Sequence, residues 1–516
     1  MYKSELSGRV SVSDEDVIVS KPAVHAIPSE ELETALTHFN LDEPADGPQP
    51  PATSPSAILS QENIPMMNLP PELLAHIFDL ACHDPTSKFY IEKNRKQTIT
   101  PFILGGVCSQ WRAVVWSTPT TWSRISLYLV TSKYETQLEL LKGWLARTGK
   151  KPLTIDFLFQ EENDWCERIP TEIIELLRTS APRWREINWV LPEAWYPLLA
   201  GIKFNLPLLT TLSTQSLWHD CSLSPSKRKR LDLFADTPAL RDLHLNGYYL
   251  SDVDIPWKQL VRLKLQHVYI DECFFALSET QLLESCKMYT ILYNDVNRTI
   301  EAKSIGLPFL TYLHFYHSNW EDAKILLSSM TAPSLRTLEF TDPLGDEVPL
   351  LPSLLSNIGC NLTRLKVVDW SFTRHPDLVE FIRGIFSLTE IKIRLRQPSS
   401  VMSDFFIQLL WTRAPTFDVE NEEETYFLPY LKHFTFSGCV GLRNGFENEL
   451  LHLLQCRRPS TDKVESKVVP LLSFTLDVFE GGGTPLVPGD ELKGQLQVLV
   501  TDGLELSIAF EGTSWL

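Results

Sequence analysis

The sequence lacks the patterns that mark several common classes of protein. Its nine cysteines are scattered and none stands in a C-x-x-C pair. This argues against a disulfide framework or a zinc knuckle and suits a reducing compartment. No apolar run reaches the roughly 18 residues of a membrane helix, and the N-terminus has neither the basic nor the apolar region of a signal peptide. We therefore expect a cytoplasmic or nuclear protein that makes no membrane contact.

Catalytic and cofactor motifs are also missing. The chain has no G-x-S-x-G, no H-E-x-x-H and no EF-hand loop, and its 12 histidines are isolated from one another. The nearest approach to a phosphate loop fails, because Gly143 lies six residues before Gly149 rather than five. Lys151 also stands where Ser or Thr should hold magnesium. We expect a protein that is not an enzyme and that holds no cofactor and no metal.

Positive charge is in short supply. Lys and Arg number 47 against 65 Asp and Glu, so the formal net charge is −18, which argues against general nucleic-acid binding. Residues 1–63 hold 11 acidic and 3 basic residues, seven prolines and few aromatics. Such a segment cannot bury enough apolar area to offset its ordering entropy, which predicts a disordered acidic tail. Ser226–Arg230 resembles a nuclear import signal, and a solvated loop is the alternative.

Leucine is in excess, with 78 copies, and a repeated pattern accounts for many of them. The pattern is P-x-Φ-x-x-Φ-x-Φ, where Φ is apolar, as in Pro238–Leu245, Pro308–Phe315 and Pro333–Phe340. The first apolar positions of the copies are 184, 209, 240, 260, 288, 310, 335, 362, 388 and 431. Most of these spacings are close to the period of leucine-rich repeats. One strand and one helix in each repeat predict a curved α/β solenoid.

Residues 64–125 predict three short helices with wide apolar faces. Leu69–Ala81 has prolines at its start, where a helix tolerates them. A second helix takes Thr100 as its N-cap and continues through Val115, and a third short turn carries Trp122. The apolar side chains cover more area than three short helices can hide among themselves. This surplus is typical of a partner site or a domain interface.

The same segment resembles an F-box. The family pattern is LPxE-Φ-Φ-xx-IF, then V-C-xx-W-R, then a terminal Trp. Residues 69–78 read LPPELLAHIF, residues 107–112 read VCSQWR, and Trp122 follows. The phrasing is similar to F-box proteins of mushroom-forming fungi, whose C-terminal halves often carry degenerate leucine-rich repeats. The 28 residues between Phe78 and Val107 exceed the animal pattern and imply an inserted loop.

The resemblance implies a partner and a function. F-boxes bind the Skp adaptor subunit of Skp–cullin–F-box ubiquitin ligases, so this chain would be a non-catalytic adaptor that brings an unknown substrate protein to the ligase for ubiquitination. The competing interpretation is a leucine-rich-repeat scaffold that binds proteins without ligase assembly. Carried over by position, the Skp-binding residues would be Leu69, Pro70, Leu73, Leu74, Ile77, Phe78, Val107, Cys108, Trp111 and Trp122. The alternative for these residues is an internal helical core.

Polar residues that flank the inward apolar positions of the strands are predicted to face the concave surface of the solenoid. Four of them form a basic patch on two adjacent strands, suited to an acidic or phosphorylated segment of a substrate. The plainer interpretation is an ordinary solvated strand face. The possible substrate-binding residues are Tyr312, His314, Arg364, Lys366, Lys392 and Arg394, of which the last four form the patch.

These patterns predict an α/β chain with three parts. They are the tail at residues 1–63, a three-helix F-box at 64–125 and a leucine-rich-repeat solenoid at 126–516, with an acidic insertion near 418–426. After the third short turn we expect a strand at 125–129, a helix at 134–147 and a strand at 153–157. Helices are also expected at 320–330 and 378–386, between repeat strands.

Overall fold

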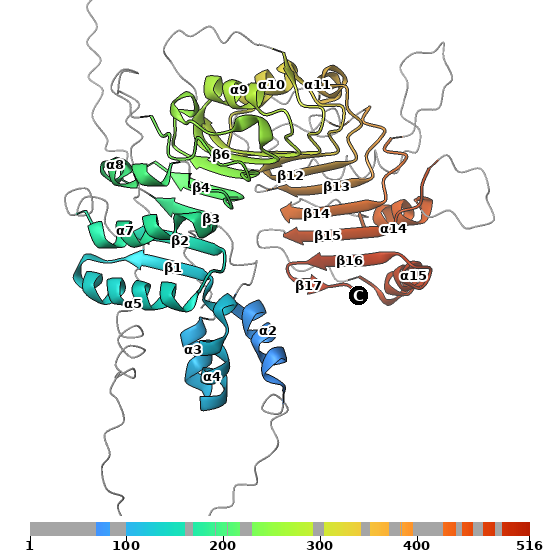
Figure 1. Cartoon of the computed structure of the whole chain (residues 1–516). Helices are drawn as coiled ribbons and strands as arrows, with labels where there is room; N and C mark the ends of the chain where they lie inside the picture. The colour runs from blue at the N-terminus through green and yellow to red at the C-terminus, as the bar shows by residue number, and fades with distance from the viewer. Residues whose placement is uncertain are drawn as a thin grey trace, which may run out of the picture. The chain divides into compact units, whose positions relative to one another are not determined.

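The computed structural model describes residues 69–82, 100–159, 169–190, 192–203, 205–216, 230–292, 304–341, 351–370, 382, 384–395, 427–439, 446–457, 468–479 and 488–516. Within these residues the chain is mixed α/β, with 11 α-helices and a large, mostly parallel sheet (Figure 1). It divides into two compact units, residues 1–122 and residues 123–516. We call them the helical unit and the sheet unit.

Several predictions fall outside the described residues. They concern the acidic tail at 1–63, the acidic insertion near 418–426, nearly all of the basic run at 226–230 and most of the expected helix at 378–386.

The helical unit contains the three short elements that the sequence predicts, with one difference. Its elements are α2 (Pro71–Cys82), α3 (Pro101–Val107), α4 (Ser109–Ser117) and the 3₁₀ turn η3 (Pro119–Trp122). Thr100 is the N-cap of α3 as predicted, because its Oγ1 accepts a hydrogen bond from the amide of Ile103 at 3.4 Å.

The prediction of one continuous helix from Thr100 through Val115 is wrong. The helix breaks at Cys108, whose backbone is extended, with φ −160° and ψ 170°. The Cys108 Sγ accepts a hydrogen bond from the amide of Trp111 at 3.4 Å and so caps the start of α4. Gly105 and Gly106 precede the break, and glycine is among the weakest helix formers.

Aromatic rings fill the interior of the helical unit. Phe102 and Trp116 both meet the Trp122 ring edge to face, each with ring centroids 5.3 Å apart. The Trp122 Nε1 donates a hydrogen bond to the carbonyl of Val115 at 2.9 Å, so the polar atom of this fully buried ring is satisfied. The ring of Trp122 therefore ties η3 to both α3 and α4.

The sheet unit is built on one 15-stranded sheet whose strands follow one another in chain order. Neighbouring strands are parallel up to β16, and β17 joins β16 in the antiparallel direction. Two short strands, β8 (Ile305–Gly306) and β10 (Met330–Thr331), form a separate parallel pair. The strands of the large sheet are β1 (Arg124–Leu129), β2 (Leu153–Phe159), β3 (Trp184–Val190), β4 (Thr211–Gln215), β5 (Asp242–Asn246), β6 (Arg262–Tyr269), β7 (Ser285–Leu292), β9 (Tyr312–Tyr316), β11 (Thr337–Thr341), β12 (Arg364–Trp370), β13 (Glu390–Leu395), β14 (His433–Cys439), β15 (Ser473–Phe479), β16 (Glu505–Phe510) and β17 (Thr513–Ser514).

Helices connect many of these strands, and Figure 1 shows them along one side of the sheet. They are α5 (Tyr134–Arg147), α7 (Thr171–Ser180), α8 (Tyr196–Leu199), α9 (Ile270–Glu279), α10 (Trp320–Ser329), α11 (Leu351–Ile358), α14 (Phe446–Cys456) and α15 (Asp490–Thr501). The bounds of α5 are those predicted, and α10 ends one residue before the predicted end. Short 3₁₀ turns, η4 (Thr131–Lys133), η5 (Ala181–Arg183), η6 (Glu193–Trp195), η7 (Ala200–Ile202), η9 (Leu250–Asp252) and η10 (Trp257–Gln259), complete the connections.

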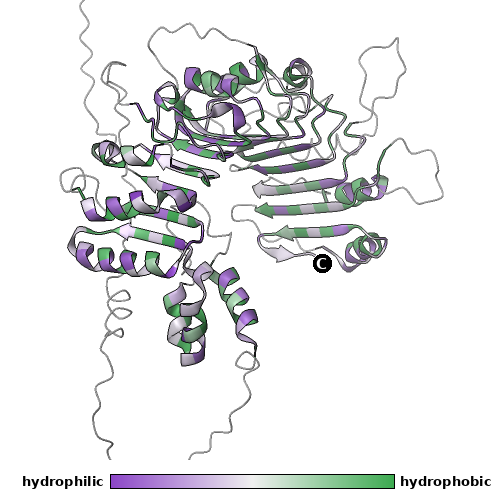
Figure 2. Ribbon diagram, viewed as in Figure 1, coloured by the Kyte–Doolittle hydropathy of each residue, from purple (hydrophilic) through white to green (hydrophobic). Residues whose placement is uncertain are grey.

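The repeated apolar positions stack across the sheet. Leu313, Leu338 and Leu365 lie in register on β9, β11 and β12, and all three are buried. Polar residues alternate with them, so the strands carry apolar and polar stripes (Figure 2). The buried face packs against the helices and forms one continuous core from Ile125 to Trp515.

One copy of the repeat was predicted in the wrong frame. The sequence pattern places its apolar positions at Met288, Ile291 and Tyr293. In the structure Cys286 and Met288 are the residues in register with Leu263 and Leu265 of the preceding strand. The cause is Cys286, which is fully buried and acts as a small apolar residue.

No helix in the described part of the chain is both long and apolar enough to cross a membrane.

Candidate functional site

The helical unit leaves large apolar side chains in contact with solvent. On α2, Leu73, Ile77 and Leu80 follow one another at helical spacing, and on α3 Ile103 and Val107 lie one turn apart. These five side chains are 38–61% exposed. We call them the apolar helix face. Their exposure is unusual, because an isolated helix pair normally turns its apolar stripes inward.

The structure divides the ten predicted Skp-binding residues into three groups. Leu74, Phe78 and Trp122 are fully buried and hold the helices together. Leu69, Cys108 and Trp111 are partly buried. Pro70, Leu73, Ile77 and Val107 are exposed. Sequence reasoning did not include Leu80 and Ile103 among the contacts, although each continues the spacing of an exposed neighbour.

A second candidate surface is the polar face of the sheet. Its middle row places one side chain from each strand beside the next, in register. We call this the polar row, and its members are Lys264 on β6, Lys287 on β7, His314 on β9, Glu339 on β11, Lys366 on β12 and Lys392 on β13. Four lysines and one carboxylate give the row an excess of positive charge in an acidic protein.

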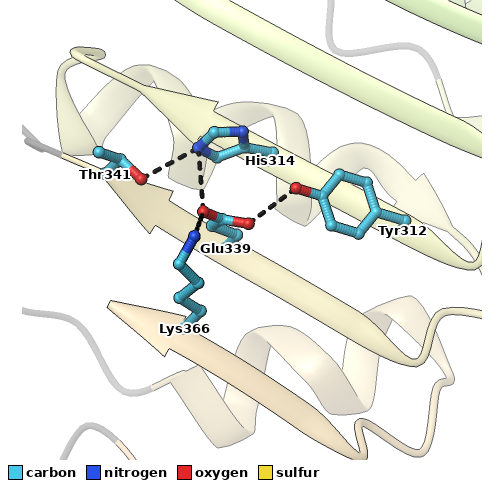
Figure 3. Close-up of polar contacts among 5 residues, drawn as sticks. All are labelled: Tyr312, His314, Glu339, Thr341 and Lys366. Carbon is cyan, nitrogen blue, oxygen red and sulfur yellow. Dashed lines mark hydrogen bonds and ion pairs between the residues drawn. The ribbon is translucent and has the colours of Figure 1, made fainter. Parts of the chain in front are cut away.

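A hydrogen-bonded network occupies the centre of the polar row (Figure 3). The hydroxyl of Tyr312 donates to Glu339 Oε2 at 2.7 Å, and Lys366 Nζ contacts Glu339 Oε1. The Nε2 of His314 lies 3.1 Å from the hydroxyl of Thr341 and 3.8 Å from Glu339 Oε1. The network links β9, β11 and β12 through one carboxylate.

Burial shapes the ionisation of this network. Burial alone would raise the pKa of Glu339, but the hydrogen bond from Lys366 and the other polar contacts lower it below its usual value. Burial lowers the pKa of His314 to about 4, against the opposing charge of Glu339. His314 is therefore neutral near pH 7, and it is only 7% exposed. This predicted substrate-face residue lies largely inside the network, while Tyr312 is partly exposed.

The predicted basic patch lies on adjacent strands, as expected, and carboxylates pair with Arg364 and Lys366. Lys366 and Lys392 are in register on β12 and β13. Arg364 Nε lies 3.1 Å from Glu390 Oε2, and Lys366 pairs with Glu339. Lys392 and Arg394 are both exposed.

The structure also places the candidate Tyr312 beside side chains that were not among the candidate residues. Lys264 Nζ lies 4.6 Å from the centroid of the Tyr289 ring, and Lys287 Nζ lies 5.5 Å from that of Tyr312. The rings of Tyr289 and Tyr316 lie 5.1 Å apart. The repeat at β7 was predicted in the wrong frame. Lys287 and Tyr289 were therefore not recognised as residues that flank the buried positions of this strand.

Both surfaces are suited to non-covalent binding. Among the described residues, no group of three or more His, Cys, Asp or Glu side chains could hold a metal ion. No model of a known protein family matches the chain, and no curated protein matches its sequence.

Proposed function

We propose that the chain is the substrate-recognition adaptor of a Skp–cullin–F-box ubiquitin ligase. The helical unit would be the F-box that binds the Skp subunit, and the sheet unit would be a leucine-rich-repeat solenoid that binds the substrate protein. The LPPELLAHIF, VCSQWR and Trp122 blocks support the first assignment. One parallel strand per sequence repeat, in chain order, supports the second.

The observation that carries the proposal is the separation of two apolar sets on the same helices. Leu74 and Phe78 of α2 are buried in the helical unit, whereas Leu73 and Ile77 beside them are exposed. Burying one such side chain against a partner stabilises the complex by about 1.5–3 kcal/mol before association costs. The exposed set thus offers apolar area to a partner without removing the internal core.

In this role the chain itself makes and breaks no bond. It raises the effective concentration of substrate lysines near the ubiquitin-loaded enzyme of the ligase. The candidate surface for the substrate is the polar face of the sheet, with Tyr312, Arg364, Lys366, Lys392 and Arg394 on its exposed or partly exposed positions.

Co-purification with the Skp subunit tests the proposal. We expect the wild-type chain to recover Skp and cullin, and the triple variant Leu73→Ala, Ile77→Ala, Val107→Ala to lose about tenfold or more of the Skp, since several apolar contacts are removed. The matched control truncates three exposed apolar residues of the sheet unit, Leu282→Ala, Phe309→Ala and Val498→Ala, and should recover Skp normally.

Two results would count against the adaptor. Negligible Skp recovery by a folded wild-type chain would leave the scaffold interpretation. Equal recovery by wild type and the triple variant would show that the apolar helix face does not make the contact.

A further inference from the structure

Among the residues that the structure describes, two lysines of the polar row have no carboxylate partner. Lys264 and Lys287 lie side by side in register on β6 and β7. In the described part of the chain neither has a carboxylate within ion-pairing distance, whereas Arg262, in the next row of the same face, pairs with Asp242. Burial and then the charge of Lys287 lower the pKa of Lys264 to about 8. Two adjacent like charges repel, so an anion bound between them would relieve the repulsion.

Histidine side chains flank the two lysines. His314 lies in register with Lys287 on one side, and His244 of β5 lies in register with Lys264 on the other. Among the described residues, the buried Nδ1 of His314 has no hydrogen-bond partner, whereas His244 meets Ser213 through Nδ1 at 3.0 Å. The His314 nitrogen lies beside Lys287 and can exchange a hydrogen bond with a polar group bound there, as buried polar atoms normally do.

Left-handed backbone borders the same place. Asn246, Gln266, Tyr289 and Tyr316 lie in register on four successive strands of the large sheet. The residue after each has a left-handed backbone, at Gly247 (φ 73°), His267 (φ 51°), Thr290 (φ 53°) and His317 (φ 47°). A β-branched residue such as Thr290 rarely adopts this conformation. Such strain concentrates at functional sites, because the surrounding structure must impose it.

We propose that Lys264 and Lys287 bind an oxyanion, either a carboxylate or a phosphate monoester, carried by a peptide segment of the substrate protein. This assignment rests on the proposed function and gives the substrate segment its chemistry. Two adjacent cations fit one oxyanion, and Tyr289, Tyr312 and Tyr316 offer rings to the flanking side chains of the peptide. A net charge of −18 opposes the extended phosphate backbone of a nucleic acid.

The test measures peptide binding by the full chain. The probes are three pools of degenerate nonapeptides with phosphoserine, glutamate or serine fixed at the centre. We expect the phosphoserine pool, with or without the glutamate pool, to bind more tightly than the serine pool. Lys264→Gln with Lys287→Gln should weaken that binding by about tenfold or more, because charge-assisted hydrogen bonds are lost.

A matched control removes two positive charges that lie outside the strands, on η10 and α10. Lys258→Gln with Lys324→Gln changes the net charge equally and should bind the pools as wild type does. If only the phosphoserine pool binds, the ligand of the two lysines is a phosphate monoester. If the phosphoserine and glutamate pools bind equally, the two lysines accept either oxyanion. The proposal is overturned if the wild-type chain binds all three pools equally. It is also overturned if the control variant loses as much affinity as Lys264→Gln with Lys287→Gln. Retention of a single-stranded oligonucleotide in place of the peptides also overturns it.

The pH dependence tests Lys264 directly. Anion binding favours its charged form, so the affinity should fall as the pH rises from 7 to 9. Lys264→Arg should keep its affinity over this range, because a guanidinium stays protonated. The groups that face Lys264 are Asp242 and His244 on β5 and Lys287 and Tyr289 on β7. Equal pH profiles for wild type and Lys264→Arg would contradict this role.

The two proposals fail separately. Peptide binding is measured without Skp, so its absence in a chain that still captures Skp rejects the oxyanion site alone. Peptide binding by a chain that captures no Skp rejects the adaptor function alone.

Discussion

Glu339 keeps its charge on an almost fully buried side chain because its neighbours satisfy it. Lys366 supplies the opposite charge and Tyr312 a hydrogen bond, so both carboxylate oxygens have a partner. His314 stays neutral beside them. A buried charge is tolerated when it is paired and hydrogen-bonded. Each member of this network therefore depends on side chains from neighbouring strands.

The buried His314 predicts a loss of stability in acid. Its pKa is about 4 in the folded protein, against an unperturbed value of 6.5. A lowered folded pKa means that the stabilisation is present above pH 6.5 and is lost as the pH falls toward 4. Between pH 7 and pH 5 the loss is about 2 kcal/mol. Urea unfolding should show that His314→Gln reduces this loss.

The exposed His452 supplies the control for this measurement. His452→Gln should follow the wild-type dependence on pH. If His314→Gln shows the same pH dependence as wild type, the neutral, buried state of His314 is wrong.

At the scale of elements, the close approach of α3 to α4 depends on one glycine. A Cβ on Gly105 would lie 2.7 Å from Cη2 of Trp116 and nearer still to its Cζ3. The next residue, Gly106, is exposed and has no atom within 4 Å of such a Cβ. The Trp116 ring therefore packs against the α3 backbone at Gly105, where no side chain intervenes, and it makes no such contact at Gly106.

This difference predicts opposite effects of the same substitution at adjacent positions. Gly105→Ala should destabilise the helical unit by about 1–3 kcal/mol, because the Trp116 ring must move. Gly106→Ala should stabilise it by about 0.5–1 kcal/mol, because alanine loses less entropy on forming a helix. Chemical unfolding followed by tryptophan fluorescence measures both. A neutral Gly105→Ala would mean that the two helices are not so closely packed.

At the scale of the whole molecule, the buried apolar side chains form two separate sets. The continuous core of the sheet unit runs from Ile125 to Trp515 and does not include the buried side chains of the helical unit. In the large sheet each strand pairs with the next strand of that sheet in chain order, which is the pattern of a repeat array. Leu74 belongs to the first set of buried residues and Leu365 to the second.

The separation predicts that core substitutions act on their own unit. Leu74→Ala should lower the unfolding temperature of the helical unit and leave the sheet unit unchanged, and Leu365→Ala should do the reverse. Each truncation of a fully buried leucine costs about 2–5 kcal/mol. Calorimetry of the full chain provides the measurement. One transition that both substitutions shift equally would contradict separate cores.

Local patterns in the sequence were enough to place most of the elements. The helix at Tyr134–Arg147 and the repeat strands follow from alternating or helical spacing of apolar residues, which acts within a few positions of the chain. The N-cap at Thr100 likewise depends on its own neighbours. These features could be predicted because the residues that determine them are close in sequence.

Tertiary structure decided which of the candidate residues are available to a partner. It buried Leu74 and exposed Leu73 on the same helix, paired Arg364 with Glu390, and enclosed His314 between neighbouring strands. It also fixed the frame of β7 and so placed Lys287 beside Lys264. Each result depends on side chains far apart in sequence. Burial and charge pairing are properties of those contacts, so no local pattern contains them.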